Sequence, residues 1–228
     1  MSSPCTLGGA VCQLHVAFGN AGALRVSWVS ATLGNASRPS VEWGHLPDGL
    51  EHSVLATSTS YALDDLCLPA EVRVRGWEDP GLQHHAELAG ALRDGRAVYY
   101  RVGFAASGIW SNVTGPVTSV VGDEARLAVF GDMGTYAYAP KHDTGLGAVD
   151  NQVATSLARA ARERRLHAVV HVGDIAYAHD GPASRWRYWF DEIEPVASVT
   201  PYMIGCGNHE YEICRSSTRA ARLRAPPT

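Results

Sequence analysis

The pattern of apolar residues changes at about residue 125, and this change constrains the fold more than any other feature of the sequence. Before it, short segments such as 24–29 and 97–102 alternate apolar and polar residues, which is typical of half-buried β-strands. After it, continuous apolar runs alternate with helical patterns, which is typical of buried parallel strands joined by helices. Because folded domains usually contain about 100–200 residues, the 228-residue chain is expected to hold two.

The first region predicts an antiparallel β-sandwich. Further candidate strands lie at 13–18, 41–43 and 72–74, and turn signals such as Pro47-Asp48-Gly49 and Asp79-Pro80-Gly81 separate the strands. Short strands broken by turns at this spacing are typical of a sandwich of about one hundred residues. Residues 11–121 are therefore expected to form an all-β, immunoglobulin-like or fibronectin-like domain.

The second region, 125–213, predicts the order strand, helix, strand, helix, strand. The strands are expected at 127–130, 167–172 and 202–204. The first helix is expected to present one apolar face made of Val149, Val153, Leu157 and Ala160. The second is expected to end near Pro195 and to pack a core face made of Trp186, Trp189, Phe190 and Ile193. This order implies a parallel sheet, the first βαβαβ part of an α/β domain.

Composition excludes some partners and leaves others open. The formal net charge of −4 gives no electrostatic reason to expect nucleic acid. No apolar run of about 18 residues occurs, so no membrane association is expected, and the N-terminus lacks the pattern of a signal peptide. The five cysteines have no CxxC spacing and predict neither a zinc ribbon nor a disulfide framework. Sequons at Asn35 and Asn112 would suit a secreted domain.

Each predicted strand of the second region ends in a polar cluster. The clusters are Gly131-Asp132-Met133-Gly134, Gly173-Asp174-Ile175-Ala176-Tyr177 and Gly207-Asn208-His209-Glu210. A single Gly-Asp pair usually caps a turn or helix, but parallel sheets place their ligand sites beyond the carboxyl ends of the strands. Three clusters in this order are therefore expected to converge on one crevice.

The side chains in these clusters are suited to metal ions. Hard cations favour carboxylate, amide and phenolate oxygens, which Asp132, Asp174, Tyr177 and Asn208 supply. Two metals about 3.5–4 Å apart need a bridging ligand, and Asp174, which follows the middle of the three strands in the chain, is the candidate bridge.

The three clusters resemble the opening motifs of the purple acid phosphatases, GDxG, GDxxY and GNH[DE], a branch of the calcineurin-like metallophosphoesterases. All three match without substitution. The broader superfamily has histidine where this chain has Gly134 and lacks the tyrosine found here as Tyr177, so the match points to the purple branch. Residues 76–81 and 98–103 also look like the N-terminal fibronectin-like domain of large plant-type members.

The resemblance implies a dimetal phosphatase centre. Asp132 and Tyr177 would bind Fe(III), Asp174 would bridge, and Asn208 would bind a divalent Zn, Fe or Mn ion. His209 would be the catalytic residue outside the metal sphere, assisting substrate binding or leaving-group protonation. A metal-bound hydroxide would attack a phosphate ester, as in an acid phosphatase or a nucleotide phosphodiesterase.

Glu210 is expected to orient its neighbours rather than to bind metal. Further expectations follow from the positions at which the chain departs from the family pattern. The later motifs VxxH and GHxH, which contribute three histidine ligands, do not occur before Thr228. A C-terminally truncated member is expected, with exposed apolar surface in the second domain and a basic, disordered tail at 214–228. His179 and Asp180 are candidates for the rim of the site.

Three functions stay open at this point: a phosphatase, a catalytically inactive member acting at most as a binding module, and an adhesion-type module that explains only the first region. The resemblance implies a small-molecule phosphate ester as substrate, a secreted or vacuolar location, and allows a homodimer. The natural substrate, the second metal and the oligomeric state are not determined by the sequence.

Overall fold

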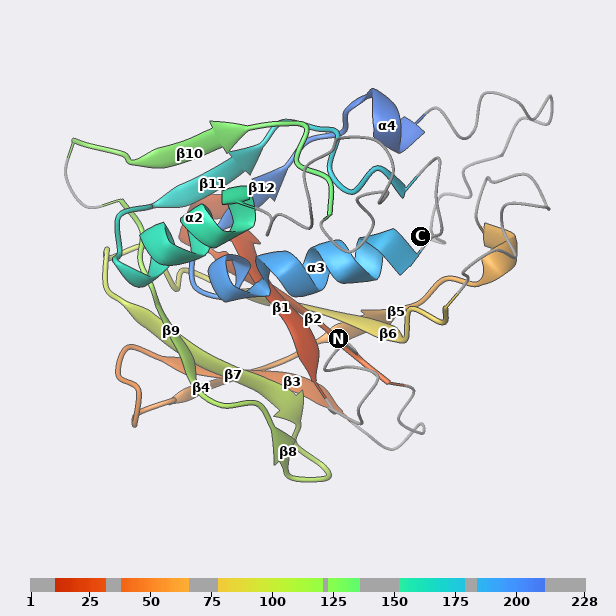
Figure 1. The fold of residues 1–228 in the computed structure, drawn as a ribbon. Coiled ribbons are helices and arrows are strands. Elements are labelled where there is room, and N and C mark those ends of the chain that lie inside the picture. The colour runs from red at the N-terminus through yellow and green to blue at the C-terminus, as the bar shows by residue number, and fades with distance from the viewer. Residues whose placement is uncertain are drawn as a thin grey trace.

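The computed structural model describes residues 11–31, 38–65, 78–120, 123–135, 152–178 and 184–211. Two antiparallel sheets form one part of the molecule, and a three-stranded parallel sheet forms the other. The helices α2 (Gln152–Arg162) and α3 (Ser184–Ala197) lie on the side of the parallel sheet that faces the antiparallel region (Figure 1).

The antiparallel sheets follow the predicted alternation of apolar residues. The first has the order β1 (Cys12–Phe18), β2 (Leu24–Ser30), β6 (Leu82–Leu88), β5 (Thr57–Thr59). The second has the order β4 (His52–Leu55), β3 (Pro39–Gly44), β7 (Val98–Phe104), β8 (Ile109–Trp110), with β9 (Thr114–Val117) also paired to β7. The strands predicted around 13–18, 24–29, 41–43 and 97–102 are confirmed, whereas the one at 72–74 lies outside the described residues.

The inward-facing residues of both sheets make one hydrophobic core. Leu24, Val26 and Trp28 on β2 are buried in this core, whereas Arg25 is exposed, because the period of two of a strand places neighbouring side chains on opposite faces. Tyr100 and Phe104 on β7 are also fully buried. Fully burying a large apolar side chain such as these contributes about 1.5–3 kcal/mol to stability.

The second region has the predicted strand and helix order. The strands β10 (Leu127–Phe130), β11 (Ala168–His171) and β12 (Tyr202–Ile204) are parallel, and α2 and α3 connect them. Phe130 pairs with His171, and His171 pairs with Ile204, so all three strands end at the same edge of the sheet. The short helix α4 (Asn208–Tyr211) follows β12.

The buried face of α2 differs from the predicted one. The buried residues are Ala154, Leu157, Ala158 and Ala161, at spacings of three and four. Val153 is 41% exposed, and Val149 lies outside the described residues. Successive helical residues are about 100° apart, so a face that includes Ala154 turns Val153 toward solvent. The larger side chain was wrongly assigned to the core because alanines also pack well where a helix lies close to its neighbours.

The helix α3 passes through Pro195 and ends at Ala197, two residues after the proline, so its predicted end near Pro195 is confirmed to within two residues. Proline removes only its own N–H, and the next turns still form bonds, from Ser198 N to Glu194 O at 3.0 Å and from Thr200 N to Val196 O at 2.9 Å. Trp189 is fully buried, as predicted for the core face.

Polar contacts fasten α3 to the antiparallel region. The Gln13 side chain donates to Asp191 Oδ1 at 2.8 Å, and its backbone N–H donates to Glu194 Oε2 at 3.1 Å. Burial raises the pKa of Glu194. Cys12, beside Gln13, is disulfide-bonded, which the cysteine spacing did not predict. β1 is therefore both a sheet strand and the surface on which α3 packs.

The hydrogen bond from Tyr100 Oη to the backbone carbonyl of Ser198, 2.7 Å long, joins β7 to the end of α3. We expect Tyr100→Phe to lower the free energy of unfolding by about 1 kcal/mol, because the ring stays and one buried bond is lost. Urea denaturation measures this change. Tyr99→Phe is the matched control, since Tyr99 is the neighbouring residue on the opposite face of the strand, and an equal effect of both variants would contradict the assignment.

The face of the parallel sheet turned away from α2 and α3 exposes large apolar side chains. Leu127 is 51% exposed, Val129 62% and Val172 56%, while the alternate residues Ala128 and Phe130 pack into the core with the helices. Exposed apolar surface in this region was predicted from the sequence.

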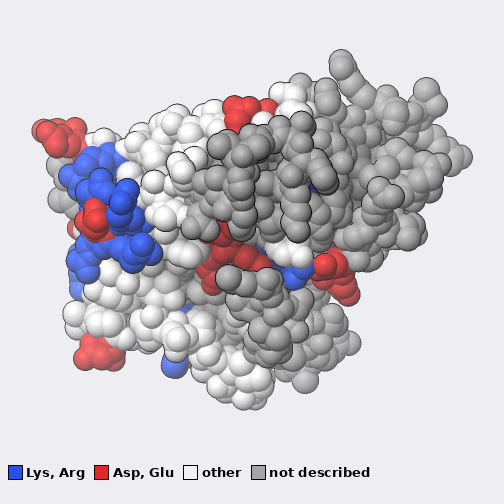
Figure 2. All heavy atoms as spheres, viewed as in Figure 1, with Lys and Arg blue, Asp and Glu red and all other residues white. Residues whose placement is uncertain are grey.

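Basic side chains gather at one end of the viewed face (Figure 2). The last turn of α2 carries Arg159 and Arg162, where positive charge interacts favourably with the helix dipole. No helix among the described residues is long and apolar enough to cross a membrane.

Candidate metal centre

The loops that follow β10 and β11 run side by side beyond the sheet. The backbone N–H groups of Asp132 and Gly134 donate to the carbonyls of Gly173 at 3.1 Å and Ile175 at 2.8 Å, and Met133 N donates to Asp174 O at 3.2 Å. These bonds extend the parallel pairing past the ends of the strands. They bring the first two polar clusters together, as expected at the carboxyl edge of a parallel sheet.

Three of the four predicted metal ligands have left-handed backbone conformations. The φ angles are 58° at Asp132, 54° at Asp174 and 52° at Tyr177. Non-glycine residues rarely adopt this region, and the strain costs about 1–3 kcal/mol per residue and concentrates at functional sites. The surrounding packing therefore holds these three side chains in positions that the local backbone alone would disfavour.

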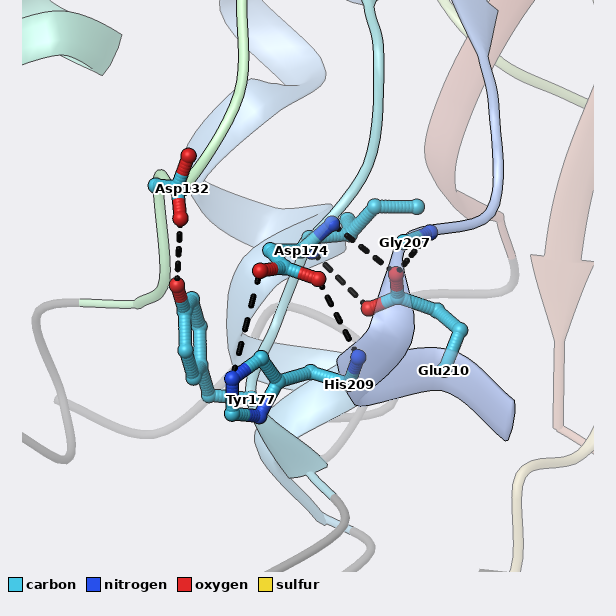
Figure 3. Close-up of polar contacts among 7 residues, drawn as sticks. Asp132, Asp174, Tyr177, Gly207, His209 and Glu210 are labelled. Carbon is cyan, nitrogen blue, oxygen red and sulfur yellow. Dashed lines mark hydrogen bonds and ion pairs between the residues drawn. The ribbon is translucent and has the colours of Figure 1, made fainter. Parts of the chain in front are cut away.

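The side chains from the three loops meet at one place (Figure 3). The Tyr177 hydroxyl donates to Asp132 Oδ1 at 3.0 Å. The backbone N–H of His209 donates to Asp174 Oδ1 at 3.1 Å, and His209 Nε2 lies 3.9 Å from Asp174 Oδ2. The rings of Tyr177 and His209 have centroids 4.3 Å apart. Two carboxylates, a phenol and an imidazole thus line one site.

Two glycines allow the loops after β11 and β12 to touch. A Cβ on Gly207 would lie 2.1 Å from Asp174 Oδ1 and 2.3 Å from Asp174 N. A Cβ on Gly173, whose φ is 139°, would lie 2.6 Å from the Cα of Gly207. Glycine is therefore required at both positions by close backbone approach, and at Gly173 also by the positive φ.

Glu210 holds the same two loops together. Its carboxylate accepts the backbone N–H groups of Asp174 and Ile175, each at 2.9 Å, and that of Gly207 at 2.8 Å. Hydrogen bonds to an ionised acceptor are stronger than neutral ones. Both carboxylate oxygens of Glu210 face backbone N–H groups (Figure 3). Glu210 therefore orients its neighbours.

Burial and the neighbouring carboxylates both favour the protonated form of Tyr177. Burial, the hydrogen bond to Asp132 and the nearby carboxylates of Asp174 and Glu210 raise the pKa of Tyr177 to about 12. The phenol therefore keeps its proton near neutral pH in the metal-free chain. A cation that binds the phenolate oxygen must displace this proton, so its affinity is coupled to pH.

His171 lies at the end of β11, three residues before Asp174, and was not singled out from the sequence as a site residue. Its side chain is fully buried at the end of β11, its Nδ1 lies 3.2 Å from the Tyr202 hydroxyl, and its ring packs 4.6 Å from that of Phe130. Burial lowers the pKa of His171. The only available signal was its place in the apolar run before Gly173.

The structure brings Asp132, Asp174, Tyr177 and His209 together but leaves Asn208 apart from their contacts. Asn208 is exposed and begins α4. Within the described ranges, no group of three or more His, Cys, Asp or Glu side chains is arranged to hold a metal ion. The converging oxygen donors are instead the two aspartates and the Tyr177 phenol. The rim candidates at 179 and 180 and the tail at 214–228 lie outside the described residues.

Comparisons with known proteins agree with the motifs. Residues 11–118 match the family described as purple acid phosphatase, N-terminal domain. The chain is similar to probable inactive purple acid phosphatase 9 of Arabidopsis thaliana, with 32% identity over 88% of this chain and 30% of that protein. It is also similar to purple acid phosphatase 5 of Arabidopsis thaliana, with 28% identity over 90% of this chain and 46% of that protein.

A solved structure supports the same relationship across both regions. It is a purple acid phosphatase isolated from yellow lupin (Lupinus luteus) seeds, which matches 88% of this chain with a TM-score of 0.68 and 28% identity. The match covers 36% of the lupin chain, so this chain spans only about a third of that relative. The N-terminal family match, the two plant relatives and the shared fold together show that the chain belongs to the purple acid phosphatase family.

Proposed function

We propose that this chain builds part of a dimetal centre that hydrolyses phosphate esters. The observation that carries the proposal is the convergence of Asp132, Asp174 and Tyr177 from two strained loops, with the Tyr177 hydroxyl 3.0 Å from Asp132 Oδ1. Carboxylate and phenolate oxygens are the donors that hard cations prefer.

Each ligand has a distinct role in the proposal. In this proposal Asp132 and Tyr177 would hold Fe(III), Asp174 would be the bridging ligand to a divalent Zn, Fe or Mn ion, and Asn208 would hold that divalent ion. Asn208 is included because it follows Gly207, which lies against Asp174, and because its side chain is exposed. When bound, the two cations would polarise the phosphate and lower the pKa of a coordinated water.

His209 is positioned to act on the substrate without binding metal. Its backbone N–H is fixed by Asp174 at 3.1 Å and its ring packs against Tyr177. These contacts hold the imidazole at the edge of the carboxylate site. From there it can bind a phosphate oxygen or donate a proton to the leaving group.

Hydrolysis of 4-nitrophenyl phosphate by the purified chain, after loading with Fe(III) and Zn(II), tests the activity. The proposal predicts metal-dependent turnover that falls about 100-fold in His209→Ala while the bound metal is retained, because general acid catalysis contributes about 10²–10⁴-fold. Turnover unchanged in this variant would remove His209 from the mechanism.

The proposed substrate is a small-molecule phosphate ester. We also propose a secreted or vacuolar location for the protein.

A second candidate function is a catalytically inactive family member that acts as a binding module. The observation that favours it is the name of several similar plant proteins, which are described as probable inactive purple acid phosphatases. Metal binding without any hydrolysis would support this alternative, whereas robust metal-dependent turnover would exclude it.

A further inference from the structure

The connection between β8 and β9 carries a motif that has no part in the metal centre. Asn112-Val113-Thr114 is an Asn-x-Thr triplet, the acceptor motif for N-linked glycans in secreted proteins. Asn112 follows the end of β8 by two residues, and Thr114 begins β9. β8 lies at the opposite end of the molecule from the parallel sheet (Figure 1). A group attached at Asn112 is therefore remote from the candidate metal ligands.

The side chain of Asn112 is accessible while its backbone is held in place. The residue is exposed, and the next one, Val113, is 43% exposed. The backbone carbonyl of Asn112 accepts hydrogen bonds from the hydroxyls of Ser111 at 2.9 Å and Thr114 at 3.3 Å. A bulky, hydrophilic group is normally carried on a surface connection of this kind. A glycan on the Asn112 amide would therefore displace no packed side chain.

The strand register places Trp110 beside Asn112. Trp110 pairs with Gly103 of β7, and Ser111 N donates to Val102 O at 2.8 Å, so the pairing continues one residue past the end of β8. Neighbouring residues of a strand point to opposite faces. Trp110 and Asn112, on either side of Ser111, therefore lie on one face, which is opposite to the core face that carries the buried Val102.

Trp110 offers a partly exposed aromatic surface to whatever is attached at Asn112. Arg101 Cζ lies 4.8 Å from the centre of the Trp110 ring, and Arg101 pairs with Glu42 Oε2 at 2.6 Å. These contacts hold the indole against the outer face of the sheet and leave it only partly buried. A pyranose ring carries C–H groups on one face and hydroxyls around its edge. It can pack on an indole while its hydroxyls stay in water.

We propose that Asn112 is an N-glycosylation site whose first sugar packs on Trp110. The amide nitrogen of Asn112 loses one proton and forms a bond to C1 of the sugar. The bond between C1 and the pyrophosphate of a lipid-linked oligosaccharide breaks, and the lipid pyrophosphate leaves with its electron pair. The proposal rests on the secreted or vacuolar location proposed above and is independent of the proposed hydrolysis.

Site-specific mass spectrometry tests the modification. The chain is secreted behind a cleavable signal peptide from eukaryotic cells that attach high-mannose glycans, and peptide N-glycosidase F then releases the glycans in ¹⁸O-labelled water. Asn112 is expected to appear as ¹⁸O-labelled aspartate. Thr114→Val, which keeps the branched shape, should abolish the label, whereas Thr114→Ser should retain it, because the motif needs a hydroxyl. An unlabelled Asn112 in chain recovered from the medium would overturn the proposal, since secreted chain has passed the transferase.

Thermal unfolding tests the packing of the sugar. Endoglycosidase H leaves one N-acetylglucosamine on Asn112, and this trimmed chain should melt about 2–4 °C above Asn112→Gln, as one stacking contact requires in a chain of this size. The difference should vanish when both chains also carry Trp110→Leu. It should persist when both carry Leu127→Ala, which changes a residue 51% exposed on the distant parallel sheet. Circular dichroism follows each transition. An equal difference with and without Trp110→Leu would overturn the packing on Trp110.

Discussion

Gly207→Ala is expected to dismantle the metal centre while leaving the antiparallel sheets folded. The new Cβ would lie 2.3 Å from the backbone nitrogen of Asp174 and 2.1 Å from its Oδ1, and backbone atoms cannot rotate away as a flexible side chain can. We expect the free energy of unfolding to fall by about 1–3 kcal/mol, as in other overpacked sites. Iron affinity should fall about 10–100-fold, because Asp174 is displaced. Urea denaturation and iron titration measure the two effects.

Gly205→Ala is the matched control, since it lies two residues away on the same loop. Its Cβ would approach Val172 O at 3.3 Å, which a small local shift accommodates, so we expect a loss of less than about 1 kcal/mol and unchanged iron affinity. Equal effects of the two substitutions would show that the contact between Gly207 and Asp174 does not control the site.

Glu210→Gln is expected to loosen the two loops that carry the ligands. The carboxylate accepts three backbone N–H groups, from Asp174, Ile175 and Gly207. The amide that replaces it has one oxygen acceptor and turns an NH₂ donor toward a backbone donor. We expect a loss of about 2–4 kcal/mol in the free energy of unfolding, because bonds to a charged group contribute about 1.5–3 kcal/mol each. Iron affinity should fall about tenfold.

The control for this change is Glu163→Gln, which removes a carboxylate from an exposed pair with Arg165. Exposed ion pairs contribute about 0–1 kcal/mol, so this variant should be close to the unmodified chain in both measurements. If Glu210→Gln were equally mild, the three backbone bonds would not be what positions the site.

The fold was predictable wherever residue pattern alone determines structure. β10 and β12 have the predicted bounds, and β1, β2, β3 and β7 lie at the predicted alternating segments. The buried face of α2 was not predictable, because small alanines rather than Val153 meet the neighbouring elements. The passage of α3 through Pro195 also depends on tertiary packing, which compensates for the bond that proline removes.

The residues proposed for the candidate site could be named from the sequence, but their geometry could not. Glycine and acidic residues after three strands indicated Asp132, Asp174 and Tyr177. Their left-handed conformations depend on bonds between loops that are distant in sequence, so no local pattern encodes them. The contact between Gly173 and Gly207 has the same origin. Sequence motifs list which residues can bind a metal, whereas strain and close backbone approach determine whether they meet.

Iron content and visible absorption of the purified chain, measured beside Tyr177→Phe, test the central claim most directly. The variant keeps the ring that packs on His209 but removes the hydroxyl that donates to Asp132. The proposed centre predicts bound iron with a visible tyrosinate-to-iron band in the unmodified chain, and loss of that band in Tyr177→Phe. Absence of bound iron, or an identical band in the variant, would contradict the assignment of Asp132 and Tyr177 as iron ligands.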